Sequence, residues 1–256
     1  MMLFIYNIFV ALLSLNPMII DSGEFLLTKY HYLIQPEGTS LNIENVIGSS
    51  DFIALDHENI NFGINNDIVW LRYDLINKTE NTNKFLFIKN SSLDSLDLFV
   101  VKDGIVTQTY SGGRLYDFDQ KIIPSKSIIF NVELPKNEEV SIYLRVKSVN
   151  KTIITSSIND RNIIESLINR ENIIFGIFSG IIIGLFFYNL FLFFSVKDKI
   201  YLIYVVHTIL VFLAQSSILG YTNELMWPDN VWLKLRAGVI FSSLVSVVGI
   251  WFLREF

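Results

Sequence analysis

The pattern of hydrophobic and polar positions changes sharply along this chain near residue 172. Between Asp21 and Asn172, apolar residues are interspersed with Asn, Asp, Lys and Ser, whereas charged residues nearly vanish from Ile173 onward. Alternating apolar and polar residues are typical of a domain that folds in water, and long uncharged runs are typical of membrane spans. The pattern therefore predicts an exposed domain, residues 21–158, followed by a membrane region, residues 173–256.

The exposed domain has the period of β-strands, because apolar and polar residues alternate in several short runs. Turn sequences such as Asp103-Gly104 and Gly112-Gly113 separate some of the runs. The predicted strands cover residues 26–34, 68–75, 85–89, 96–101, 105–110, 128–134, 140–146 and 153–158. Short strands without a long helix between them indicate an all-β jelly roll or β-sandwich.

Two helices are expected outside the membrane region. Residues 42–47 can form a short helical turn. Residues 159–172 have apolar side chains at positions 163, 164, 167 and 168, which lie on one face of a helix. We expect this second helix to join the exposed domain to the first membrane span.

Three uncharged runs follow, each long enough to cross a hydrocarbon layer of about 30 Å. They predict transmembrane helices at about residues 173–196, 200–222 and 234–253. Lys197 and Lys199 separate the first two helices and should lie in the cytoplasm under the positive-inside rule, with the β domain outside. Lys234 and Arg236 then fall on the outer side, where their long side chains could reach the interface.

Small and polar residues inside the predicted spans indicate helix packing. Gly176, Gly180 and Gly184 recur every four residues and permit close helix approach, within the chain or in a homodimer. Asn189, His207 and Gln215 are expected to form interhelical hydrogen bonds, which are a commoner role for such residues than a proton pathway.

The first 20 residues are apolar and contain no acidic residue. The uncharged run from Leu3 to Leu15 suits the hydrophobic region of a secretory signal peptide, which we predict for residues 1–20. Neither an N-terminal Lys or Arg nor a clear cleavage motif is present, so an uncleaved anchor and a buried first strand are the alternatives.

Composition excludes several classes of function. The chain has 256 residues and a net charge of −5, which gives no basic surface for nucleic acid. It contains no cysteine, and its three histidines do not have the spacing of metal ligands. No catalytic motif is present, so we expect neither a cofactor nor enzymatic activity.

A repeated aromatic–arginine pair supplies the candidate ligand site. In residues 68–75, strand alternation places Trp70 and Arg72 on the face opposite the core, and in residues 140–146 it does the same for Tyr143 and Arg145. The predicted core faces consist of Val69, Leu71, Tyr73 and Leu75, and of Val140, Ile142, Leu144 and Val146.

An aromatic ring can stack on a sugar, and a guanidinium group can bind hydroxyl groups or a carboxylate. Trp70, Arg72, Tyr143 and Arg145 are therefore the predicted ligand-binding residues. In the commoner structural alternative, the arginines stack on the rings and pair with Asp74 or another carboxylate, and a loop covers Trp70. Further polar residues that could contribute are Asp94, Asp97, Arg114, Tyr116 and Asp119.

Several motifs resemble one family. The segments NFGINNDIVWLRYDL, LDSLDLFVV and EVSIYLRVKS are similar to the periplasmic domain of bacterial seven-transmembrane receptors with diverse intracellular signalling modules. The segments GIFSGIIIGLFFYNLFLFFSVKDKIYLIYVV and GYTNELMWP resemble the start of that family's membrane region. The resemblance covers about residues 26–256.

This resemblance implies a jelly-roll sensor for a small, carbohydrate-like ligand in the periplasm, seven helices in the bacterial inner membrane, and a cytoplasmic output module. Three spans are recognisable here, as expected for a fragment of a receptor or for a truncated product. The expected partners are the small ligand, membrane lipid and a second copy in a homodimer. The alternative function is a membrane-anchored binding or assembly protein with no signalling output.

Overall fold

A computed structural model describes residues 16–57, 59–64, 66–116, 123, 125–149 and 151–255. The chain divides into two compact units, Met1–Ile164 and Glu165–Phe256. Most of the predicted signal peptide, residues 1–15, lies outside the described residues, and so does Asp119.

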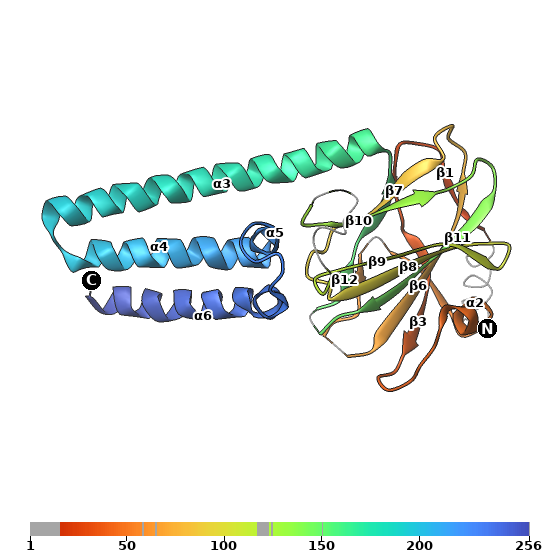
Figure 1. The fold of residues 1–256 in the computed structure, drawn as a ribbon, viewed down its shortest axis with the longest axis horizontal. Helices are drawn as coiled ribbons and strands as arrows, with labels where there is room; N and C mark the ends of the chain where they lie inside the picture. Colours follow the sequence, from red (N-terminus) through yellow and green to blue (C-terminus); the bar gives the residue numbers. More distant parts are fainter. Residues whose placement is uncertain are drawn as a thin grey trace, which may run out of the picture. The chain divides into compact units, whose positions relative to one another are not determined.

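The larger sheet of the first unit has the strand order β4-β3-β6-β11-β8-β9, with β1 beside the end of β6 (Figure 1). All neighbours are antiparallel except β1, which runs parallel to β6. The strands are β1 (Met18–Ile20), β3 (Lys29–Gln35), β4 (Ile53–Asp56), β6 (Ile68–Asn77), β8 (Ser95–Lys102), β9 (Ile105–Gly112) and β11 (Glu139–Lys147).

The second sheet is antiparallel and has the order β10-β7-β13-β2. Its strands are β2 (Glu24–Leu26), β7 (Asn83–Ile88), β10 (Ile128–Glu133) and β13 (Ser156–Asn159). A two-stranded ladder joins β5 (Ile60–Asn61) to β12 (Ile153–Ile154). The predicted strand at residues 26–34 thus includes the end of β2 and most of β3, and the one at residues 153–158 contains β12 and most of β13.

The two sheets pack face to face around one large hydrophobic core. Every residue that alternation assigned to the core faces of β6 and β11 is buried in this core, together with residues such as Leu86, Phe130 and Ile158 from the second sheet. The Tyr73 hydroxyl is buried there and satisfied by the Ser156 hydroxyl at 2.8 Å. The predicted β-sandwich is confirmed, while the jelly-roll connectivity stays a prediction.

Strand β1 uses residues that the signal-peptide prediction assigned to the leader. Met18 and Ile20 are buried in the sandwich core, and Ile19 lies opposite Ile76 of β6. Cleavage after residue 20 would remove this strand, so a signal-peptide cleavage compatible with the sandwich falls before Met18. The signal peptide itself stays a prediction.

The short helical turn expected near residue 42 is helix α2 (Ile43–Ile47). Asn42 starts it with a reciprocal cap: its side chain accepts a hydrogen bond from the Asn45 amide, and the Asn45 side chain accepts one from the Asn42 amide. Such paired caps satisfy backbone groups that a helix end would otherwise leave without partners.

The second unit is helical, with α3 (Arg161–Val196), α4 (Lys199–Ile218), α5 (Tyr221–Leu225) and α6 (Val231–Glu255). Helices α3, α4 and α6 are long and apolar enough to cross a membrane, which confirms that three long apolar helices follow the sandwich. The joining helix expected at residues 159–172 is continuous with the first span in α3. Helix α4 is followed by Gly220, whose φ of 88° suits glycine and redirects the chain into α5.

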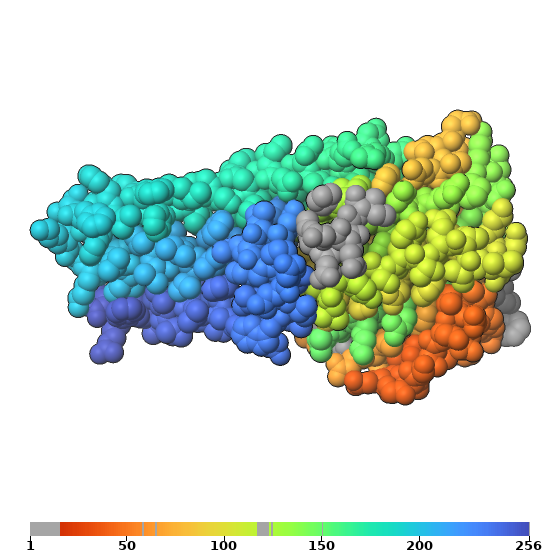
Figure 2. Space-filling model, in the orientation of Figure 1, coloured from red at the N-terminus to blue at the C-terminus, as the bar shows by residue number. Residues whose placement is uncertain are grey.

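Helices α4 and α6 lie side by side, as Figures 1 and 2 show. They run antiparallel, because Lys199 at the start of α4 forms an ion pair of 3.1 Å with Glu255 at the end of α6. His207 faces Gly249 of α6, where a Cβ atom would lie 3.5 Å from the imidazole Nε2. The amide of Asn189 bonds within its own helix, to the Leu185 carbonyl.

Candidate functional site

The aromatic members of the predicted site, Trp70 and Tyr143, are buried on the outer face of the larger sheet. Their exposed fractions are 1% and 2%. Trp70 donates to the Gln35 side chain at 2.8 Å and stacks on Phe99, and the Tyr143 and Phe52 rings pack in a T-shaped arrangement. These residues form a second, smaller core with the segment around α2. Other residues of this smaller core are Leu33, Leu41, Ile43, Val46 and Ile68. Neither ring therefore offers an open face to a ligand.

Arg72 lies beside this covered region and is partly exposed. Its Nε donates to Asp74 at 2.8 Å, and its guanidinium carbon lies 5.9 Å from the Tyr143 ring centre. Ser141 donates to the same Asp74 oxygen at 2.6 Å. Burial alone would lower the pKa of Arg72, but the hydrogen bond and charge of Asp74 outweigh it and raise the pKa. Arg72 is thus a permanent cation held beside a carboxylate.

His31 of β3 lies opposite Arg72 in the strand register. Its Nδ1 is 3.7 Å from Asp74 and has no hydrogen-bond partner among the described residues. Burial lowers the pKa of His31 more than Asp74 raises it, and Arg72 lowers it further. The imidazole is therefore neutral at pH 7, and its contact with Asp74 is not an ion pair under that condition.

Arg145 repeats the arrangement with a different carboxylate. Its Nη1 lies 3.0 Å from Asp97, whose other oxygen accepts from Ser111 at 2.7 Å and from Tyr116 at 3.2 Å. The two arginines thus make the carboxylate contacts of the structural alternative. They are also the accessible members of the predicted set, with 33% and 29% of their side chains exposed.

A cleft of about 330 Å³ lies where the outer face of β8 and β11 ends. Ser95 and Lys147, which are partners in the strand register, both line it, and Lys147 shares a strand face with Arg145. The remaining lining residues are Glu37, Asn66, Asp94, Leu115, Ser148 and Val149. This volume lies at the lower end of the range for small-molecule sites.

One wall of the cleft is held by a buried ion pair. Asp94 is 4% exposed; it accepts from Arg114 Nε at 3.1 Å and from the Val149 amide at 2.8 Å. Sequence reasoning named both charged residues without ranking them, and it did not find the cleft. Glu37 and Asn66 come from separate loops, so the alternation pattern of a single strand could not predict that they line the cleft.

A β-sandwich followed by helices of membrane length defines a membrane protein with a folded domain ahead of its spans. The family profile 7TMR-DISM extracellular 2 matches residues 28–159, and the profile 7TM diverse intracellular signalling matches residues 171–256. The chain belongs to this receptor family, which confirms the resemblance seen in its motifs. Its N-terminal domain is accordingly extracellular, and both domains indicate a membrane sensory receptor rather than an enzyme.

Solved structures give only distant likenesses. A β-glucuronidase of Faecalibacterium prausnitzii is 9% identical, with a TM-score of 0.31 over 52% of this chain and 22% of that one. An apo β-glucuronidase of Ruminococcus gnavus is 9% identical, with a TM-score of 0.32 over 53% of this chain and 23% of its own. A family 35 carbohydrate-binding module of Clostridium thermocellum is 7% identical, with a TM-score of 0.25 over 54% and 97%. No curated protein matches the chain. Likenesses this weak carry no inference about ligand or activity.

Proposed function

We propose that this protein is an inner-membrane signal-transduction receptor whose periplasmic sandwich binds a small, carbohydrate-like ligand. Its membrane helices would pass the signal to an output module. The observation that carries this proposal is the short path from sandwich to span. Strand β13 ends at Asn159, and α3 starts at Arg161 and continues as one helix to Val196. A change in the sandwich can therefore act directly on the first membrane helix.

The ligand would contact the outer face of the larger sheet and the adjoining cleft. Arg72 and Arg145 supply partly exposed guanidinium groups, and the buried Tyr143 and Trp70 are their respective partners in the strand register. The cleft adds two carboxylates, an ammonium group and hydroxyl groups. Mixed donors and acceptors of this kind suit a ligand rich in hydroxyl groups, because each hydroxyl both donates and accepts.

The site is tested by screening a saccharide panel against the full chain in lipid nanodiscs. We expect Arg72→Ala, Arg145→Ala or Lys147→Ala to weaken binding of a hit about tenfold, as loss of a charged hydrogen bond predicts. Lys102→Ala is the matched control, since Lys102 pairs with Glu138 at the opposite end of the same sheet. Unchanged affinity in all three site variants would refute this placement. Trp70 is tested only as Trp70→Phe, because removing a buried ring would test folding instead.

Signalling through α3 is tested in a receptor that carries an output module after these helices. Inserting two residues after Ser166 rotates the rest of α3 by about 200°, whereas inserting seven residues rotates it by only about 20°. We expect the two-residue insertion to abolish the ligand response and the seven-residue insertion to preserve more of it. Equal responses in both would favour the alternative, a membrane-anchored binding or assembly protein without output.

A homodimer stays a proposal. Apart from the backbone of α3 itself, added Cβ atoms at Gly176, Gly180 and Gly184 would meet no atom of the described residues within 4 Å. Crosslinking through single cysteines placed beside the stripe would test it.

A further inference from the structure

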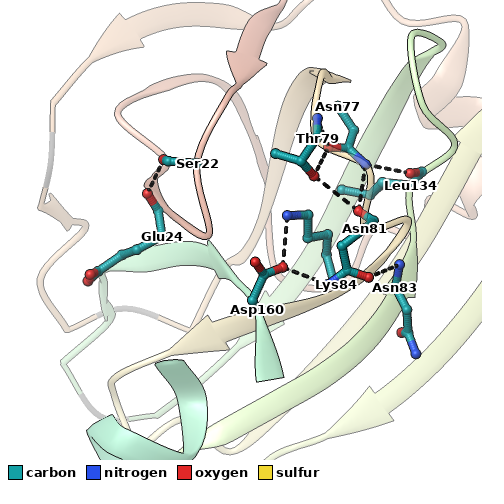
Figure 3. A network of polar contacts seen from close by, with 9 residues as sticks. All are labelled: Ser22, Glu24, Asn77, Thr79, Asn81, Asn83, Lys84, Leu134 and Asp160. Atoms are coloured by element: carbon teal, nitrogen blue, oxygen red, sulfur yellow. Dashed lines mark hydrogen bonds and ion pairs between the residues drawn. The ribbon is translucent and has the colours of Figure 1, made fainter. Parts of the chain in front are cut away.

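The joint between the sandwich and α3 contains a buried lysine. Lys84 of β7 has no exposed surface, and its Nζ lies 2.9 Å from Oδ1 of Asp160. Asp160 is the residue immediately before α3 (Figure 3). A buried ammonium group without a counter-charge is strongly unfavourable, so this contact ties the folded sandwich to the residue that starts the helix.

Asp160 is anchored on several sides. Its amide donates to the Gly23 carbonyl at 2.6 Å, between β1 and β2, and its carboxylate accepts from the Asn81 side chain at 2.7 Å, between β6 and β7. Its own carbonyl accepts from the amides of Ile163 and Ile164 at 3.1 Å, which closes the first turn of α3. The start of the helix is thus fixed to two turns and one strand of the sandwich.

The same network reaches the strand that carries the candidate site. Asn77, the last residue of β6, is buried and donates to the carbonyls of Asn81 and Leu134, both at 2.9 Å (Figure 3). Arg72 lies five positions earlier in the same strand. Displacement of β6 at the candidate site can therefore act on Asn81 and, through it, on Asp160.

The Asp160 carboxylate has two competing uses. At the position before a helix, an Asp side chain usually accepts from the second or third amide of the helix. Here it accepts from Lys84 and Asn81 instead. The neighbouring Asn159 is fully buried, and its Oδ1 has no partner among the described residues. A buried oxygen without a partner is unfavourable, so an arrangement of this joint that satisfied it would gain a hydrogen bond.

We propose that the Lys84–Asp160 contact is a latch between the sandwich and α3, and that its release lets Asp160 cap α3 instead and so alters the first membrane helix. A signalling role for this latch rests on the proposed receptor function. Its existence does not depend on the identity of the ligand.

The latch is tested by hydrogen exchange on the full chain in nanodiscs without ligand. Lys84→Met and Asp160→Ser should each raise exchange of the backbone amide at position 160 about tenfold, because each removes a charged hydrogen bond. Lys136→Met, which removes a surface pair with Glu80 near the same turn, is the control and should change it less than twofold. Unchanged exchange in both latch variants overturns the proposal.

Gly23→Ala is a further variant in case the buried substitutions prevent folding. A Cβ atom at residue 23 would lie 2.7 Å from Oδ2 of Asp160 and so displace the carboxylate without removing either charge. It should raise exchange of the Asp160 amide as the latch variants do. Exchange at Leu144 in the core reports whether the sandwich itself remains folded, and unchanged exchange at Asp160 in a folded Gly23→Ala variant also overturns the latch.

Transmission into the membrane is measured with a fluorescent label. The chain has no cysteine, so Ser179→Cys gives a single labelling site in α3. Bimane emission there should shift in Lys84→Met and stay unchanged in Lys136→Met; no shift in Lys84→Met overturns transmission. If these results hold while no saccharide changes exchange at Asp160 in the wild-type chain, the latch stands and the ligand proposal fails.

Discussion

The two units use the same apolar residue types in opposite ways. In the sandwich, Leu71 and Leu144 are completely buried, whereas in the helices Ile177, Phe194 and Val239 are 62%, 67% and 72% exposed. Backbone hydrogen bonds are satisfied within each helix, so such a surface is stable in hydrocarbon although it would be unfavourable in water. The contrast shows that burial within the protein stabilises the first unit, and that the second requires apolar surroundings such as lipid hydrocarbon or other membrane helices.

The sharpest test of this contrast is removal of one large ring from each unit. Trp70→Ala should lower the free energy of unfolding of the sandwich by about 3–5 kcal/mol, since it leaves a cavity and removes the donor that Gln35 Oε1 accepts from. Phe194→Ala, on the exposed surface of α3, should cost less than about 1 kcal/mol. Both losses are measured by chemical denaturation in nanodiscs, with amide hydrogen exchange used to monitor the unfolding of each unit. Equal losses would contradict the assignment of Trp70 to a core.

Ion pairs should differ between the units in the same way. Asp94→Asn removes the negative charge that the nearly buried Arg114 contacts and should destabilise the sandwich by about 3 kcal/mol. Glu255→Gln breaks the pair with Lys199, whose side chain is 73% exposed, and should cost much less, because solvent screens an exposed ion pair. The unfolding midpoints of the two variants give the comparison. A loss at Asp94 as small as that at Glu255 would show that the cleft wall does not depend on this pair.

The smallest expected effect is a pH dependence confined to the sandwich. The pKa of His31 is lowered below its ordinary value of 6.5, chiefly by burial, so the unfolded chain binds this proton more readily. Stability should therefore fall as pH drops through 6.5 and level off below the folded pKa. His31→Gln should flatten this part of the stability–pH curve. A wild-type stability that rises on acidification through this window would contradict the sign.

The sequence predicted the parts of this structure that depend on local period. Alternation identified Leu71 and Leu144 as core residues, and uncharged length identified the spans. It gave the covering of Trp70 only as an alternative and did not identify the residues that cover Trp70 and Tyr143, because those around α2 and Phe52 lie well apart from both strands in the chain. The sequence also did not predict that His31 would lie opposite Arg72 in the strand register, or that Lys84 would contact Asp160, which is 76 positions away. Contacts of this kind depend on tertiary packing, which local pattern does not encode.

The position of β13 has a consequence for the order of folding during export. Although β13 is the last of the described strands, it lies inside the second sheet, between β7 and β2. A chain emerges from its N-terminus, so this sheet cannot close until residue 159 has crossed the membrane. The next segment to arrive is the first span. The sandwich therefore closes at the stage of export at which α3, the helix that follows it, enters the membrane.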